Sequence, residues 1–288
     1  MGPASSATKN ERVRPAKRAS SLKPRGTRPV SVVTIAGSDS GGGAGIQADL
    51  LTLAAHGVFG TTVITAGTAQ STVELTGIET FSTGFLRKQI DVVFSDFRPK
   101  AVKIGMLFDA PRVRTVAAGL RRHRAGNVVL DPVMIAKSGV KLLTDRTRTS
   151  LIQHLFPLCD LVTPNLPEAE ALTGLRIRTR NEYRRAASVL LEHGARAVLI
   201  KGGHARTRNV LDLLYDGQRF TEFEAERIRT RATHGTGCTL SSAIAANLAL
   251  GRSLEESIAR ASSYLQAGLR NGLFPGRGFG VPDHFAAY

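Results

Sequence analysis

Hydrophobic residues follow one pattern from residue 30 onward: short runs rich in β-branched residues alternate with longer stretches whose apolar positions recur at helical spacing. Short apolar runs indicate buried strands, and their alternation with helical stretches is typical of βαβ units around a mostly parallel sheet. The pattern predicts strands over residues 30–36, 61–66, 101–104, 127–130, 160–163 and 197–201. It predicts helices over residues 44–56, 83–94, 110–122, 145–156 and 181–193. We therefore expect one large α/β domain.

The last third of the chain departs from strict alternation. Residues 210–215 and 219–223 flank Asp216-Gly217-Gln218, and this arrangement predicts a β-hairpin at the edge of the sheet. Helices are predicted over residues 237–250 and 254–270, followed by a Gly- and Pro-rich segment.

Polar and glycine-rich segments follow the predicted strands in almost every case. Open parallel sheets bind ligands at the carboxyl ends of their strands. The segments that fall there are residues 37–45, Gln70, residues 103–106, Asp131, residues 163–165 and residues 201–204. This shared edge predicts an active site.

The turn His234-Gly235-Thr236-Gly237-Cys238 opens a predicted helix. The N-terminus of a helix has unpaired N–H donors and a partial positive charge, so it can hold a phosphate and lower the pKa of a nearby thiol. The turn therefore predicts an anion hole beside a candidate base. The alternative is a glycine turn that only opens a buried helix.

The glycines at 37, 41–43 and 45 precede the first predicted helix and permit close approach of the backbone to a ligand. The spacing of Gly43, Gly45 and Ala48 mimics a dinucleotide fingerprint, but the acidic residue that would bind a ribose hydroxyl is missing. No Gly-Lys-Ser/Thr follows the glycines, which excludes a Walker loop.

Three charged residues at this edge suit phosphoryl transfer. Lys201 could stabilise transferring phosphates, and Asp131 could hold hydrated magnesium. Each has a structural alternative, since Lys201 could simply mark the exit of a strand and Asp131 could initiate an Asp-Pro turn. Glu168 lies just inside a helix that begins near Asn165, where its charge would complement the helix dipole even without a metal.

Gln70 ends a segment of small residues that leaves room for a flat ring beside its amide. An amide donates and accepts at once, so it pairs well with a heteroaromatic edge, although a lone Gln is more often a surface residue. His204 and His234 lack metal-ligand spacing, which favours hydrogen-bonding roles. Cys159 is expected in the core.

Composition limits the remaining possibilities. The 288 residues include two cysteines, and no apolar run approaches 18 residues, which argues against a disulfide framework, a structural zinc site and a membrane span and favours the cytoplasm. Residues 1–29 have eight Lys or Arg and one Glu, and they contribute to a net charge of +16. We expect a disordered tail there. A solvated extension, a polybasic arm for nucleic acid and a transit peptide remain open.

Several motifs occur together and in order: residues 36–39 with GGAGIQADL, then Ala69-Gln70, KIGM at 103, LDPVM at 130, AKSG at 136, TPNLPEA at 163, KGGH at 201 and THGTGC at 233. Together they resemble the hydroxymethylpyrimidine/phosphomethylpyrimidine kinases of thiamine biosynthesis, in the ribokinase-like superfamily. The resemblance covers residues 30–288. It implies a three-layer α/β/α fold with a mostly parallel central sheet and an edge β-hairpin.

The resemblance also implies roles for individual residues. Gln70 would grip the aminopyrimidine, in a pocket shaped by Gly37, Ala44, Asp49, Met106 and Val133. Gly235, Thr236 and Gly237 would form the anion hole, Cys238 would act as the base, and Lys201 would contact ATP phosphates, with Thr236 and Gly237 sharing the nucleotide site. Asp131 and Glu168 would arrange Mg²⁺. Many superfamily relatives have Asp where Cys238 stands, so the thiol needs a depressed pKa to act as an equally effective base.

The implied activity is ATP-dependent phosphorylation of 4-amino-5-hydroxymethyl-2-methylpyrimidine and then of its monophosphate, by a homodimer. A pyridoxal kinase is the rival enzyme, because relatives phosphorylate a similar hydroxymethyl ring. A non-enzymatic rival is a basic nucleic-acid-binding protein on a retired kinase scaffold, which rests on the charge of the tail.

Overall fold

The computed structural model describes residues 28–134, 144–204 and 208–286. These residues form one sheet of nine strands in the order β3-β2-β1-β4-β5-β6-β7-β8-β9. The strands are β1 (Ser31–Asp39), β2 (Phe59–Gln70), β3 (Leu75–Thr80), β4 (Ala101–Ile104), β5 (Val128–Leu130), β6 (Leu161–Val162), β7 (Val198–Ile200), β8 (Asn209–Tyr215) and β9 (Phe220–Glu226). The pairs from β2 through β7 are parallel, and the β8–β9 hairpin joins β7 antiparallel. The predicted mostly parallel sheet with an edge hairpin is confirmed.

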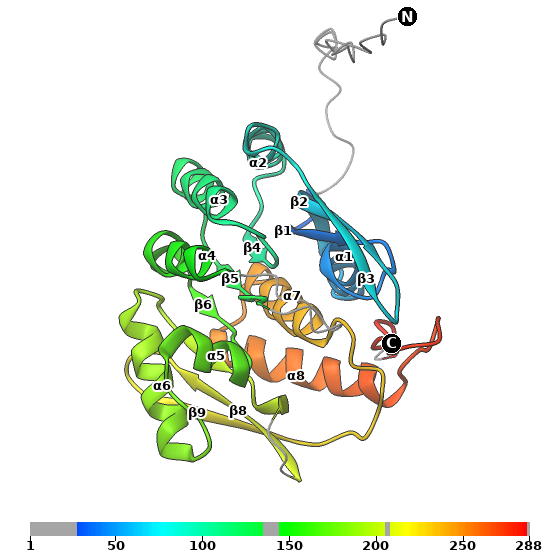
Figure 1. Cartoon of the computed structure of the whole chain (residues 1–288), viewed down its shortest axis with the longest axis vertical. Coiled ribbons are helices and arrows are strands. Elements are labelled where there is room, and N and C mark those ends of the chain that lie inside the picture. Colours follow the sequence, from blue (N-terminus) through cyan, green and yellow to red (C-terminus); the bar gives the residue numbers. More distant parts are fainter. Residues whose placement is uncertain (1–27, 135–143, 205–207, 287–288) are drawn as a thin grey trace, which may run out of the picture.

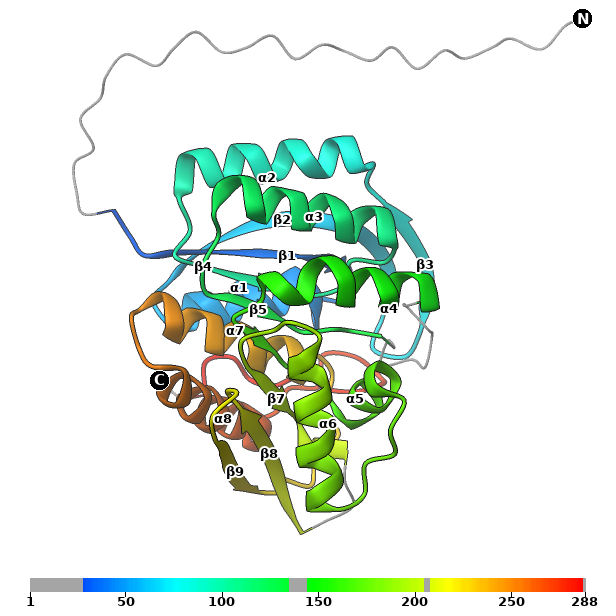
Figure 2. The same ribbon diagram turned by 90° about the vertical axis from the view of Figure 1, so that its left-hand side faces the viewer.

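Helices cover both faces of this sheet, which makes three layers. They are α1 (Gly45–Ala55), α2 (Thr83–Phe97), α3 (Ala110–His123), α4 (Asp145–Ser150), α5 (Leu166–Thr173), α6 (Arg180–Glu192), α7 (Thr236–Ala249) and α8 (Leu254–Arg270). In Figures 1 and 2, α1, α7 and α8 lie on one face and α2, α3, α4 and α6 lie on the other. The expected three-layer fold is therefore confirmed.

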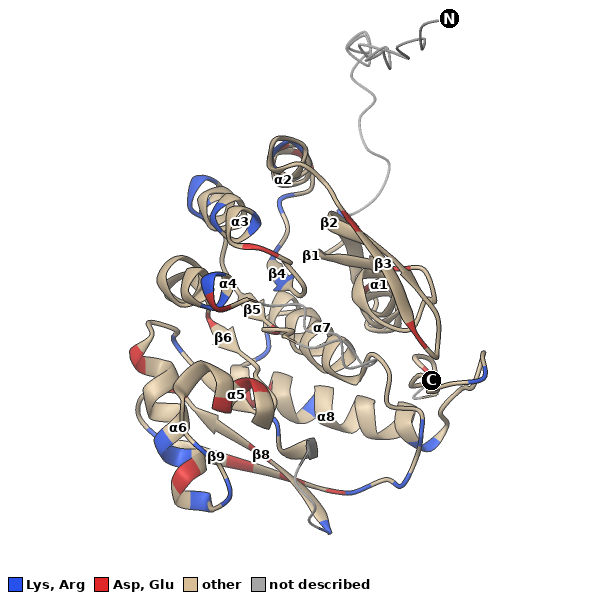
Figure 3. Cartoon of the chain, in the orientation of Figure 1, with Lys and Arg blue, Asp and Glu red and all other residues tan. Residues whose placement is uncertain are grey.

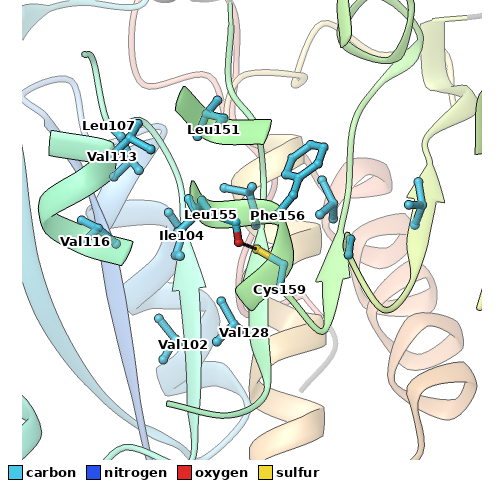
Figure 4. Packing of buried hydrophobic residues seen from close by; sticks show 14 of the residues in the cluster. Val102, Ile104, Leu107, Val113, Val116, Val128, Leu151, Leu155, Phe156 and Cys159 are labelled. Carbon is cyan, nitrogen blue, oxygen red and sulfur yellow. Dashed lines mark hydrogen bonds between the residues drawn. The ribbon is translucent and has the colours of Figure 1, made fainter. Parts of the chain in front are cut away.

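Each interface between sheet and helices has its own hydrophobic core. Under α1, α7 and α8 the cluster includes Leu53, Leu199 and Ile244, all fully buried. On the other face Cys159 is buried, and its thiol donates to the Leu155 carbonyl oxygen at 3.2 Å (Figure 4). The prediction that Cys159 belongs to the core is confirmed.

Two elements differ from their predictions. Strand β3 was not expected, because its two large apolar residues, Leu75 and Ile78, are separated by Thr76 and Gly77 and form no apolar run. It pairs only with β2, at the margin of the sheet. The single helix expected over residues 145–156 is α4 followed by a π-helical turn (Leu151–Leu155) and a 3₁₀ turn (Phe156–Leu158). Pro157 lacks the N–H that a longer helix would need.

The starts of the helices fall into two groups. Helices α2, α3, α4, α5, α6 and α8 begin with a Ser, Thr, Asp or Asn side chain that accepts a backbone N–H. Helices α1 and α7 follow the N-cap residues Ala44 and Gly235, which supply no capping side chain. Their first N–H groups are therefore left for other partners.

Charged side chains are spread over several elements. Figure 3 shows Lys and Arg on α3, α4 and α6, with acidic residues on α5, α6 and β9. Among the described residues, no helix combines the length and apolar character needed to cross a bilayer. The predicted tail lies outside the described residues except for Arg28 and Pro29.

Candidate active site

A cavity of about 680 Å³ opens where β1, β4, β5 and β7 end, beside the first residues of α1 and α7. This position agrees with the rule for open parallel sheets. Most residues expected at the site line this one cavity. They are Gly37, Ala44, Gln70, Met106, Asp131, Val133, Glu168, Lys201, Gly235, Thr236, Gly237 and Cys238.

The glycine turn before α7 depends on two residues that have no Cβ. Gly235 has φ +79°, and a Cβ there would lie 1.9 Å from the carbonyl oxygen of Gly43, so the turn rests directly on the first glycine loop. A Cβ on Gly237 would lie 3.0 Å from Asp131 Oδ2 and 3.4 Å from Lys201 Nζ. The bare backbone of Gly237 therefore leaves the start of α7 open toward both charged groups.

Lys201 and Asp131 form an ion pair beside this turn. Lys201 Nζ lies 2.7 Å from Asp131 Oδ1, and both side chains are nearly buried. Burial lowers the pKa of Lys201, but Asp131 and Glu168 raise it more, so the ammonium stays charged. Behind it, Asp212 accepts the Gly202 N–H at 2.8 Å, and burial raises the pKa of this carboxyl to about 6.

Glu168 caps the start of α5, and its carboxyl also has a raised pKa, which capping alone does not require. Its carboxylate accepts the Asn165 N–H at 2.8 Å while Asn165 Oδ1 accepts the Glu168 N–H at 3.0 Å, a capping box that starts α5. Burial raises the pKa of Glu168 to about 7; Lys201 opposes this and Asp131 adds to it. A cation in addition to Lys201 would reduce the repulsion between the carboxylates of Glu168 and Asp131.

The donor set fits a magnesium ion bound through phosphates. Among the described residues, no group of three or more His, Cys, Asp and Glu could hold a metal ion alone. Mg²⁺ commonly binds through one or two carboxylates together with substrate phosphates and water. Asp131 and Glu168 supply that number of carboxylates at the wall of the cavity.

Cys238 lies in the first turn of α7 and is partly exposed to the cavity. The depressed pKa that the thiol would need to match an Asp base is not found in the free protein. Burial raises the pKa of this thiol to about 11, with Asp49 and Asp131 adding to the rise and Lys103 opposing it. Two nearby carboxylates and desolvation outweigh the favourable electrostatics of a helix N-terminus.

Asp49 does not lie where it was expected. It is fully buried beneath the cavity and is not among the described residues that line the cavity. Its carboxylate pairs with Lys103 Nζ at 2.8 Å and accepts hydrogen bonds from the hydroxyls of Thr34 and Ser242 at 2.6 and 2.7 Å. The charge that reaches the cavity wall is Lys103, which the sequence argument left without a role.

At the other end of the cavity the surfaces are flat and small. A Cβ on Gly37 would lie 2.5 Å from Met106 Cε, so the glycine lets the thioether lie against β1. The Met106 carbonyl oxygen accepts the Thr65 hydroxyl at 2.7 Å, which ties this segment to β2. Gln70, Ala44 and Val133 complete a wall that would accommodate a ring.

Two more residues at this end, Asp39 and His234, belong to sequence motifs but had no predicted contact with substrate. Asp39 is 4% exposed, and His234 Nε2 lies 2.9 Å from Asp39 Oδ2. His234 thus has the hydrogen-bonding role that its spacing favoured. The AKSG motif at 136 and the side chain of His204 lie outside the described residues.

Comparison with known sequences identifies the family. The phosphomethylpyrimidine kinase family matches residues 39–283. Over 264 residues the chain is 49% identical to the thiamine biosynthesis bifunctional protein ThiED of Geobacter sulfurreducens, a match that covers 92% of this chain and 53% of that one. It is 48% identical over 256 residues to the hydroxymethylpyrimidine/phosphomethylpyrimidine kinase of Rhizobium meliloti, covering 88% and 96% of the two chains. The chain thus spans about half of the bifunctional relative and nearly all of the second.

Solved structures with the same fold come from two kinds of kinase. The pyridoxal kinase of Staphylococcus aureus in complex with AMP-PCP and pyridoxal has a TM-score of 0.83 at 32% identity, with 90% of this chain and 94% of that one covered. The phosphomethylpyrimidine kinase of Clostridium difficile has a TM-score of 0.74 at 40% identity, with 82% and 98% covered. Backbone similarity alone does not separate these two kinds of kinase, whereas the family match and the higher sequence identities favour the phosphomethylpyrimidine kinases. The chain belongs to the phosphomethylpyrimidine kinase family.

Proposed function

We propose that this protein transfers the γ-phosphoryl group of ATP to the hydroxymethyl oxygen of 4-amino-5-hydroxymethyl-2-methylpyrimidine, and then phosphorylates the monophosphate to the diphosphate. One observation carries the proposal. A single cavity has an amide, Gln70, beside small flat surfaces at one end, and Lys201 with the glycine turn before α7 at the other. The family of the chain and the activity named for its relatives support the same reaction.

Each residue group has a distinct task in this proposal. Gln70 holds the edge of the ring, with Gly37, Ala44, Met106 and Val133 around it. The N–H groups of Gly235, Thr236 and Gly237 and the ammonium of Lys201 surround the migrating phosphoryl group, where preorganised positive charge favours the transition state. Lys201, Thr236 and Gly237 also bind the phosphates of ATP.

Proton removal is assigned to Cys238. Its sulfur, as the thiolate, takes the proton of the substrate hydroxyl as the oxygen attacks phosphorus. The raised thiol pKa makes the thiolate scarce in the free protein but strongly basic once formed. Lys103 is the cation that favours it.

Asp131 and Glu168 would hold Mg²⁺, which supplies charge neutralisation between phosphate oxygens when bound. Their buried carboxylates support this assignment, because burial, with a smaller contribution from Asp131, raises the pKa of Glu168 and a bound cation would stabilise its charged form. We further propose a homodimeric enzyme in the cytoplasm, a location that the low cysteine content favours.

An ATP-consumption assay with the pyrimidine alcohol, its monophosphate and pyridoxal tests the function. We expect turnover with the first two and a lower kcat/KM with pyridoxal. Preference for pyridoxal would support the rival kinase, to which the fold is also similar. Failure of all three substrates to stimulate ATP use, with salt-sensitive nucleic-acid binding lost on removal of residues 1–29, would support the non-enzymatic alternative.

A further inference from the structure

Asp39, Gln70 and His234 meet at the ring-binding end of the cavity although they come from β1, β2 and the turn before α7. His234 Nε2 lies 2.9 Å from Asp39 Oδ2 and 3.4 Å from the side-chain amide atom of Gln70 assigned as Nε2. We propose that His234, held by Asp39, is a positioning residue that fixes which way the Gln70 amide faces and therefore how the substrate ring is oriented. The inference rests on the proposed aminopyrimidine substrate.

The partners of Asp39 determine where the proton of the imidazole lies. Asp39 accepts backbone N–H groups from Gly41 at 2.8 Å, Gly43 at 3.2 Å and Ala44 at 2.9 Å. A carboxylate surrounded by donors offers only acceptor oxygens. The His234 nitrogen 2.9 Å away must therefore carry hydrogen, so the neutral ring is the Nε2–H tautomer.

This tautomer decides the orientation of the Gln70 amide. With its nitrogen toward His234, two N–H groups would face each other at 3.4 Å. Thr68 Oγ1, 3.2 Å from the other end of the amide, would have to share its one hydrogen between Gln70 and the Ser38 carbonyl oxygen at 3.1 Å. Turning the amide by half a rotation removes the opposition of the two N–H groups and lets the Gln70 nitrogen donate to Thr68. The hydrogen on His234 Nε2, which points mainly to Asp39 Oδ2 at 2.9 Å, then attracts the Gln70 oxygen at 3.4 Å as a weaker second acceptor.

The groups along one edge of the substrate ring differ in order, so a fixed Gln70 amide can bind the ring in only one orientation. In the pyrimidine alcohol a ring nitrogen, the exocyclic amine and the hydroxymethyl group follow one another around the ring. The amine donates to the Gln70 oxygen on the His234 side, and the ring nitrogen accepts from the Gln70 nitrogen on the Thr68 side. The hydroxymethyl group then lies beyond the amine, toward the chain that continues from His234 into Gly235 and Cys238.

The opposite amide orientation would turn the ring over and direct the hydroxymethyl group away from the glycine turn. Pyridoxal offers a different edge, because the group beside its hydroxymethyl carbon is an aldehyde that only accepts hydrogen bonds. Its oxygen would face the Gln70 oxygen without a hydrogen between them. A fixed amide thus selects against pyridoxal, since a site built to bind a donor rejects a ligand that lacks one.

The kinetic test compares three variants with the wild type on both substrates. His234→Leu removes the donor while three backbone N–H groups still satisfy Asp39. His234→Gln restores an N–H at a similar reach, and His193→Leu, outside the cavity, is the matched control. We expect His234→Leu to lower kcat/KM for the pyrimidine alcohol roughly 10- to 100-fold. The value for pyridoxal should change much less, and His234→Gln should recover most of the loss.

Equal losses with both substrates would mean that His234 only supports the loop, and would overturn the proposal. A second measurement does not depend on catalysis. Nitrogen-15 shifts of the imidazole in the free wild-type protein report its tautomer, and we expect Nε2–H. Observation of Nδ1–H would overturn the inference whatever the activity, whereas Nε2–H in a protein that does not phosphorylate the pyrimidine would overturn the proposed function alone.

Discussion

At the end of the cavity formed by β2 and the glycine loop after β1, polar side chains already have protein partners, as Asp39 does with three backbone N–H groups and His234. At the end formed by β5, β7 and α7, buried carboxylates and lysines face one another, and the pKa of Glu168 is raised to about 7. The first end is preorganised for a neutral ring. The second end holds buried charges, one of which burial disfavours, so substitutions at the two ends should have different effects.

Removal of the proposed base should give the largest effect. Cys238→Ala should lower kcat about 10²- to 10⁴-fold, the usual contribution of a positioned proton acceptor. The Kd of the pyrimidine should hardly change, because the sulfur belongs to the charged end. Rapid-quench kinetics and equilibrium titration measure the two quantities. Unchanged turnover would refute the assignment of the base.

Adding a side chain at the start of α7 should have the second-largest effect on kcat. Gly237→Ala should lower kcat about 10²- to 10³-fold, the cost of disturbing one preorganised anion donor, because its Cβ would lie 3.0 Å from Asp131 Oδ2. Its melting temperature should change little, since the helix preference of alanine offsets the close contact with Asp131.

Gly235→Ala is the matched comparison for that variant. A side chain there would meet the Gly43 carbonyl oxygen and require a positive φ, so we expect the melting temperature itself to fall. Thermal denaturation separates the two variants. Equal destabilisation by both would show that the start of α7 is only a structural turn.

A substitution at the ring end should affect binding instead of chemistry. Gln70→Ala should weaken the Kd of the pyrimidine roughly 10- to 100-fold through the loss of two hydrogen bonds. The single-turnover rate at saturating pyrimidine should fall less. Gln218→Ala, on the turn between β8 and β9, is the control. An unchanged affinity would contradict the role of Gln70.

The last substitution should alter the pH dependence of stability without altering the cavity, because it concerns the buried Asp212 behind Lys201. The pKa of Asp212 rises from 3.8 to about 6, so between these values the folded protein binds more protons than the unfolded chain. The free energy of unfolding therefore falls as pH rises through that interval, by about 3 kcal/mol at most. Asp212→Asn lacks this fall and still accepts the Gly202 N–H, so its stability relative to the wild type should increase with pH.

Urea denaturation at several pH values between 4 and 7 measures that difference. A stability difference that does not vary with pH would indicate that Asp212 is balanced by its surroundings, as the groups at the ring end are. In that case the charged end of the cavity would differ from the ring end in the raised pKa of Glu168 but not in that of Asp212.

The sequence predicted the site where a residue's place follows from its strand. Lys201 follows β7 and Asp131 follows β5, so their meeting required only the rule that parallel strands end at one edge. The pairing of Asp49 with Lys103 could not be predicted in this way. It depends on which face of α1 turns toward β4, and neither residue lies in a loop.

The direction of the Cys238 pKa was missed for a related reason. A helix start is visible in the sequence, but desolvation and the approach of Asp49 and Asp131 arise only when α7 packs against the sheet. Strand β3 was missed because its residues form no apolar run, and pairing with β2 defines it. Local patterns therefore predicted the elements, whereas charges buried between elements required the structure.

The contact of Gly235 with the carbonyl of Gly43 joins segments that leave the ribosome at very different times. A nascent chain that ends before α7 has its first glycine loop but nothing seated on it, and it lacks the sulfur and amides of the later segment. The proposed activity thus requires that α7 has been synthesised and has folded onto the first glycine loop.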